Sequence, residues 1–126
     1  MQTQNFQNKF PIFTKTISKS NFSTADALVA HLKSKIDAHP VATFISTFDH
    51  YSHTKSLPNG NVPGELIDTK NLIFCFGADL SVVEMLAVRP RSFGIMEYAD
   101  KLIISFLEAP APMPQKTMLN WIEELE

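Results

Sequence analysis

The stretch NLIFCFGADLSVVEMLAVRPRSFGIMEYADKLIISFLEAP, residues 71–110, holds the strongest strand signals in the chain. Residues 72–76 and 102–107 are near-continuous apolar runs bounded by turn residues, a pattern typical of strands that are covered on both faces. Ala99 and Asp100 provide a turn that would close a hairpin onto the second run. We therefore predict that these runs are the central strands of one sheet.

Toward the amino terminus the sequence predicts two more strands and one long helix. Residues 10–17 and 41–48 are rich in β-branched and aromatic residues, and the second segment alternates, which places Phe44 and Phe48 on its predicted core face. Between these segments Ser23 is the expected helix cap, and a His-Pro pair ends the helix. The helix carries one apolar stripe at spacings of three and four, which consists of Ala25, Leu28, Val29, Leu32 and Ile36.

Toward the carboxyl terminus the signals are weaker. Residues 78–85 are compatible with one or two helical turns, and residues 86–88 and 93–98 with short strands that a proline interrupts. Three prolines spaced two residues apart then lead into a last amphipathic helix, whose first turn Pro114 can enter. Acidic residues crowd the end of that helix, where the helix dipole disfavours them, so we expect the end to fray or to meet a basic partner. They are Glu123, Glu124 and Glu126.

These elements predict an α+β fold with one mixed or antiparallel β-sheet of about five to six strands and two main helices packed on one face. The whole chain, residues 1–126, fits a single domain at this length. The polar, amide-rich residues 1–8 are expected to be frayed, and residues 49–70, which contain two Pro and two Gly, to form a long loop.

Two helices are too few to cover both faces of so apolar a sheet. An uncovered apolar face is an association surface, and a two-fold homodimer is the simplest way to cover it. In the alternative arrangement, the long loop and the polar amino terminus fold over that face. The sequence leaves both arrangements open, and we take the homodimer as the prediction.

Composition and charge exclude several classes of protein. Hydrophobic residues make up 44% and charged residues 19%, and the formal net charge is -2 with both signs mixed along the chain. This balance predicts neither a nucleic-acid partner nor binding to a membrane surface. Cys75 is the single cysteine, which rules out an intramolecular disulfide. No apolar run approaches the length of a membrane-spanning helix and no signal peptide is apparent, so the cytoplasm is the expected compartment.

Several short motifs are similar to those of one known family. TADALVAHLKSKI (24–36), the Asp49-His50 pair after ATFISTF, the Phe-Gly pair after NLIFC, and the segments AVRPRSFGIMEY and KLIISFLEAP occur in this order. In these features the chain resembles the bacterial domain of unknown function family numbered three hundred and two. Ala78 and Asp79 stand where that family typically has Asn-Pro. The resemblance implies a compact α+β fold, often dimeric, with no established reaction.

The first candidate site is the group Asp49, His50 and His53, where the second predicted strand enters the long loop. Two imidazoles and a carboxylate within five residues are able to ligate a divalent metal ion such as zinc, provided that a turn brings them together. A strand-end Asp-His pair more commonly caps a turn or bonds to the backbone. No metal is therefore assigned, and His50 and His53 are the candidates should one bind.

The second candidate site is the pair Arg89 and Arg91, which flank Pro90. An arginine pair on a stiff bend is suited to bidentate contacts with a carboxylate or a phosphate. Structural ion pairs with nearby acids are the alternative role of these arginines. Cys75 lies inside a predicted strand, which favours burial over reactivity.

The sequence alone does not define a reaction. We expect a small cytoplasmic homodimeric binding module for a small molecule or a partner protein, with a small anionic ligand at Asp49, His50, His53, Arg89 or Arg91 and no cofactor. The alternative is a metal-dependent or acid-base enzyme that uses Asp49, His50 and His53.

Overall fold

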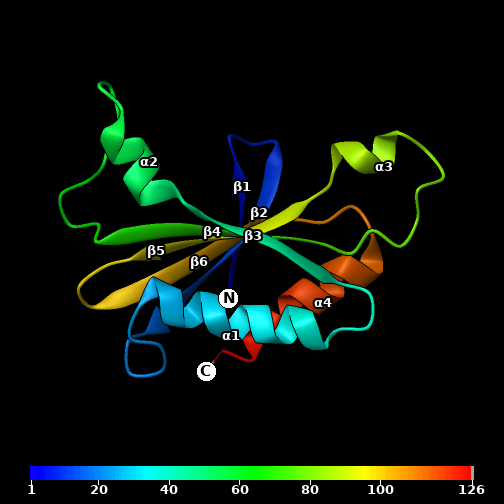
Figure 1. Cartoon of the computed structure of the whole chain (residues 1–126), viewed down its shortest axis with the longest axis horizontal. Helices are drawn as coiled ribbons and strands as arrows, with labels where there is room; N and C mark the ends of the chain where they lie inside the picture. The colour runs from blue at the N-terminus through cyan, green and yellow to red at the C-terminus, as the bar shows by residue number, and fades with distance from the viewer. Residues whose placement is uncertain (126) are drawn as a thin grey trace.

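The computed structural model describes residues 1–125, in which six strands form one antiparallel sheet in the order β1-β2-β6-β5-β4-β3 (Figure 1). This sheet and its helices confirm the predicted α+β class. The strands are β1 (Gln2–Phe6), β2 (Phe10–Ser18), β3 (Thr43–Asp49), β4 (Asp68–Cys75), β5 (Arg91–Glu97) and β6 (Lys101–Leu107). The apolar runs in residues 72–76 and 102–107 lie mainly in β4 and β6. As predicted, β6 lies at the centre of the sheet, but its central neighbour is β5, whereas β4 lies next to the edge strand β3, so the prediction that both runs are central is wrong for residues 72–76.

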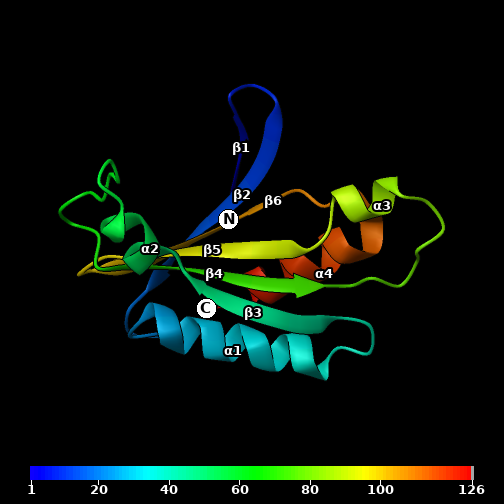
Figure 2. The same cartoon turned by 45° about the horizontal axis from the view of Figure 1, so that its top comes forward.

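Two longer helices, α1 (Ala25–Ala38) and α4 (Pro112–Glu123), pack on one face of the sheet, which we call the helix-covered face (Figures 1 and 2). Two short helices, α2 (His50–Ser56) and α3 (Glu84–Ala87), lie at opposite ends of the molecule. We call the other side of the sheet the open face. No helix in residues 1–125 combines the length and the apolar character that crossing a membrane requires.

The core lies between the helix-covered face and the two longer helices. All five residues of the predicted apolar stripe on α1 are buried, as are Met118, Trp121 and Ile122 of α4. They pack on alternate residues of the sheet, which are Ile17, Leu72, Phe74, Phe93, Ile95, Leu102, Ile104 and Phe106. Removing this apolar area from water is the main force that holds the helices on the sheet.

The first turn of α1 is capped differently from the prediction. Thr24, and not Ser23, is the cap, and its Oγ1 accepts a hydrogen bond from the N–H of Ala27 at 3.1 Å. The neighbouring N–H of Ala25 donates to the carboxylate of Glu97 at 2.8 Å. Because Glu97 lies 72 residues away on β5, no local motif could indicate this second cap.

A β-bulge in β3 makes the prediction for Phe48 wrong. Phe44 pairs with the buried Phe74, but the register shifts between Phe44 and Ser46, so that Phe48 pairs with Asn71. One extra residue in a strand reverses the faces of all the residues that follow it. Phe44 therefore packs against the core, whereas Phe48 lies on the open face and is exposed.

Three predictions of irregular or extended structure are also wrong. Residues 1–8 are not frayed, because Gln2–Phe6 pairs with β2 in a hairpin whose turn residues, Gln7 and Asn8, have φ of 54° and 58°. Residues 49–70 are not one long loop, because they contain α2 and the start of β4. Residues 86–88 are not a strand; they lie at the end of α3 and in the turn after it.

The open face carries alternate residues of the strands and has no long helix over it. Register pairs place Ile12 opposite Leu107 and Met96 opposite Ile103 on this face. Ile73 and Cys75 on β4 are also half-buried here, so Cys75 is less buried than predicted. Within one chain the central strands are therefore covered on one face only.

The acidic end of α4 meets basic residues, as one alternative predicted. Lys35 of α1 forms an ion pair with Glu124 at 3.4 Å. Lys15 of β2 donates to the backbone carbonyls of Ile122 and Glu123 at 3.2 and 3.3 Å. A cation near the last carbonyls of a helix complements the helix dipole. Glu126 lies outside the described residues.

Candidate functional site

Asp49 lies at the junction of β3 and α2 and caps the short helix. Its Oδ1 accepts from the N–H of Ser52 at 3.1 Å, and its Oδ2 from the Ser52 hydroxyl at 2.8 Å. These two bonds, together with the nearby charge of Lys70, hold the pKa of Asp49 below its ordinary value. The predicted alternative, in which the carboxylate caps a turn, is therefore its observed role.

His50 and His53 lie away from the Asp49 carboxylate. Both rings contact Phe48 on the open side of the sheet, with centroids 5.1 and 5.6 Å from that ring. The Nδ1 of His50 also lies 2.8 Å from Oδ1 of Asn71. Asp49, by contrast, pairs in register with Lys70 at the side of α1. In residues 1–125 no group of three or more His, Cys, Asp or Glu is placed to hold a metal ion, so the metal site suggested by the spacing is not formed.

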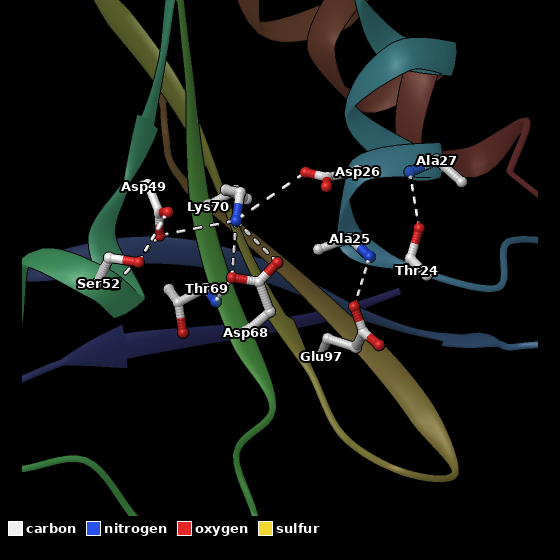
Figure 3. A network of polar contacts seen from close by, with 10 residues as sticks. All are labelled: Thr24, Ala25, Asp26, Ala27, Asp49, Ser52, Asp68, Thr69, Lys70 and Glu97. Atoms are coloured by element: carbon white, nitrogen blue, oxygen red, sulfur yellow. Dashed lines mark hydrogen bonds and ion pairs between the residues drawn. The ribbon is translucent and has the colours of Figure 1, made fainter. Parts of the chain in front are cut away.

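Lys70 lies at the centre of a charged network at this end of the molecule (Figure 3). Its Nζ lies 2.7 Å from Asp68, 3.6 Å from Asp49 and 3.9 Å from Asp26. Partial burial disfavours the charged ammonium, but the hydrogen bond and charge of Asp68 and the charges of the other two carboxylates outweigh it, so the pKa of Lys70 is raised. The network joins α1, β3 and β4, and we interpret it as structural.

The second predicted pair, Arg89 and Arg91, lies at the other end of the molecule and lines one cavity. The cavity has a volume of about 140 Å³. Its walls come from the end of β4, the α3 region, the start of β5 and the connection from β6 to α4. The lining residues are Phe76, Met85, Val88, Arg89, Arg91, Ala109, Pro110, Ala111 and Pro114. The structure thus brings together the two arginines and a set of mainly apolar side chains.

Arg91 is buried in the wall of this cavity. Its side chain lies on the helix-covered face, because Arg91 pairs in register with the buried Phe74, and the residue is only 9% exposed. Nη1 donates to the carbonyl of Val88 at 3.2 Å, Nη2 donates to the carbonyl of Leu107, and Nε has no partner in the described chain. Burial lowers the pKa of Arg91 below its ordinary value, although a guanidinium stays protonated in proteins.

Arg89 is directed toward the connection between β4 and α3. Its Nη1 donates to the carbonyl of Asp79 at 2.6 Å. The pKa of Asp79 lies below its ordinary value, mainly because the backbone N–H and the hydroxyl of Ser81 donate to its carboxylate, with a smaller contribution from the Arg89 charge. The two arginines therefore differ: Arg89 has an acidic residue close by, whereas Arg91 forms no ion pair within residues 1–125.

The start of α4 forms the remaining wall of the cavity. Its cap, Ala111, offers no side-chain hydrogen bond, and Pro112 and Pro114 lack an N–H. Gln115 stabilises the preceding connection, because its Oε1 accepts from the N–H of Ala109 at 2.8 Å. Sequence reasoning identified the arginines but missed this wall, since the spaced prolines indicated only a stiff connector.

A second cavity lies on the open face, beneath α2. It has a volume of about 240 Å³ and includes His50, Tyr51, Thr69 and Met96 in its lining. The Oγ1 of Thr69 is buried and has no hydrogen-bond partner. No charged side chain lines this cavity, so it lacks the strong electrostatic feature of the arginine cavity.

Comparison with known proteins gives one match. A family model described as "Family of unknown function (DUF6858)" matches residues 1–126. No curated protein and no solved structure matches the chain. The match confirms a domain of unknown function, as the short motifs implied, but it does not confirm the family numbered three hundred and two.

Proposed function

The chain belongs to the family of unknown function DUF6858, and we propose that it is a binding module for a small anionic molecule held at the cavity of Arg89 and Arg91. One observation carries the proposal. Arg91 is a buried guanidinium in a cavity wall, and no carboxylate in the described residues pairs with it.

A buried charge without a counter-ion is costly to the folded protein. Taking an isolated ion out of water costs on the order of several kcal/mol even after relaxation. Two backbone carbonyls accept from Arg91, which leaves three of the five N–H groups of a guanidinium without a partner in residues 1–125. An anion in the cavity would supply the missing charge.

The other walls of the cavity indicate that the ligand has an apolar part. The apolar side chains that line the cavity with Arg91 include Phe76, Met85, Val88 and Ala109. Ligand sites are commonly apolar cavities with a few well-placed polar groups that fix the orientation of the ligand. Two arginines among apolar walls fit that description.

The test is a binding measurement with two anions that share an apolar body, benzoate and phenyl phosphate. Isothermal titration is expected to detect at least one of them, with affinity reduced by about tenfold or more in Arg91→Met because the charge is lost. Lys55→Met, which changes an exposed cation on α2, is the control and should bind normally. If neither anion binds, or if both variants bind equally, the proposed function is wrong.

No observation supports the alternative of an acid-base or metal-dependent enzyme at Asp49, His50 and His53. The carboxylate bonds to Ser52, while the imidazoles pack on Phe48 and do not face it. We therefore do not carry this alternative forward as a second function.

The proposal includes pairing of two copies of the chain through the open face, in the cytoplasm. Half-buried or exposed apolar side chains on β4, β5 and β6 support it, among them Ile73, Met96 and Ile103. Light scattering at about tens of micromolar is expected to give twice the chain mass of 14.1 kDa. Met96→Lys should reduce that mass to one chain, and a single-chain mass for the unmodified protein would contradict the pairing.

A further inference from the structure

We infer that the ligand of the arginine cavity is a monocarboxylate with a compact apolar body of about six carbon atoms, bound by its carboxylate to Arg91. This inference rests on the proposed function and narrows its ligand class from small anions in general. Three independent features of the cavity support it: the number of unpaired charges, the lack of N–H groups at the start of α4, and the volume.

The charge of the cavity matches a single negative charge. Arg91 is the only buried cation among its lining residues, and no other lysine or arginine except Arg89 lines it. Arg89 already donates to the Asp79 carbonyl and lies near the Asp79 carboxylate. A monoanion would neutralise Arg91, whereas the second charge of a phosphate dianion would face only Arg89, whose charge the nearby Asp79 carboxylate already partly offsets.

The start of α4 lacks the usual means of binding a phosphate. Phosphates commonly bind at helix amino termini because several successive backbone N–H groups point at them. Here Pro112 and Pro114 occupy two of the first three helical positions, so Met113 provides the only N–H among them. The cavity therefore depends on Arg91 for recognition, and a guanidinium matches the planar geometry of a carboxylate.

The volume restricts the apolar body of the ligand. At about 140 Å³ the cavity, which is open to solvent on one side, offers about as much space as the enclosed engineered cavity of about 150 Å³ that accepts benzene. A ring or a branched chain of about six carbon atoms therefore fits beside Met85 and Ala109, and a longer chain would extend into solvent.

The test compares four probes that separate the head group from the body: benzoate, phenyl phosphate, benzamide and acetate. Titration followed by amide NMR is expected to give the tightest binding for benzoate, with shifts at Phe76 and Ala109. Benzamide lacks the charge and acetate lacks the body, so each should bind more weakly by about tenfold or more. Phenyl phosphate should also bind about tenfold more weakly than benzoate, because of the second charge and the geometry of its phosphate group.

Two variants distinguish a specific loss of binding from a loss caused by misfolding. Arg91→Lys keeps the charge without the planar fork and should weaken benzoate by about fivefold or more. Ala109→Leu fills the cavity and should abolish benzoate binding, while the amide spectrum away from the cavity stays unchanged. Tighter binding of phenyl phosphate would overturn the carboxylate inference and leave the proposed function standing. Equal binding of the uncharged benzamide would overturn both, because the charge of the ligand would then not matter. If no probe binds in a way that depends on Arg91, both the inference and the proposed function are wrong.

Discussion

The two ends of strand β5 carry buried charges in opposite situations. Glu97 is 6% exposed at one end and Arg91 is 9% exposed at the other, both on the helix-covered face. The Glu97 carboxylate accepts from the N–H of Ala25 at 2.8 Å and pairs with Lys19 at 2.9 Å. Arg91 has two backbone carbonyls and no carboxylate.

This difference separates a structural charge from a binding charge. Glu97 satisfies the first N–H of α1 and so connects that helix to the sheet. Its bonds are complete without any ligand. Arg91 keeps an unpartnered Nε and an unpaired charge beside a cavity, so it gains most when an anion is present.

The comparison predicts that Glu97→Ala has the largest effect on stability. The substitution removes a buried cap from Ala25 and a partner from Lys19, so the free energy of unfolding should fall by about 2 to 3 kcal/mol. Urea unfolding followed by circular dichroism measures it. The exposed Glu65→Ala is the control and should change stability little. If Glu97→Ala lowered the free energy of unfolding no more than Glu65→Ala does, the structural role of Glu97 would be contradicted.

Arg91→Met should have a much smaller effect in the absence of ligand. The loss of the bonds to the Val88 and Leu107 carbonyls is offset because an apolar side chain removes an unpaired buried charge. The free energy of unfolding should therefore stay within about 1 kcal/mol of the unmodified protein. The same urea experiment measures it. A loss as large as that of Glu97→Ala would mean that Arg91 is a structural charge too.

The smallest expected effect concerns how the stability of the protein depends on pH. It comes from the Lys70 network, which lies near the Glu97 end of β5. The pKa of Asp49 is lowered in the folded protein, so its stabilising contribution is present above the ordinary carboxyl pKa and is lost as the pH falls through the folded pKa. Urea midpoints measured from about pH 5 down to about pH 2 should decline less steeply in Asp49→Asn. Identical slopes for Asp49→Asn and the unmodified protein would show that this carboxylate does not stabilise the fold.

The parts of the fold that were predicted correctly have local causes. The stripe on α1 repeats at helical spacing, and residues 72–76 and 102–107 are apolar because they cross the core. The errors involve pairing between distant segments. Residues 1–8 become a strand because β2 offers its edge, and Phe48 changes face because β3 bulges against β4.

The two candidate sites differ in whether neighbours in the sequence line one cavity. The spacing of Arg89 and Arg91 around Pro90 was sufficient to suggest an anion site, because both residues come from one short segment. The grouping of Asp49, His50 and His53 suggested a metal site, but the cap on α2 directs the carboxylate to Ser52 while the two rings pack on Phe48. Closeness in sequence did not bring these side chains together.

The sequence by itself determined the α+β class, the core face of α1, the apolar strands β4 and β6 and the candidate pair of arginines, because these depend on local periodicity and residue type. Only the tertiary structure decided which charges are paired. Glu97 meets Ala25 across 72 residues, and Arg91 meets the carbonyls of Val88 and Leu107 rather than an acid. Whether a buried charge is structural or available to a ligand depends on partners from distant segments, and no local pattern specifies them.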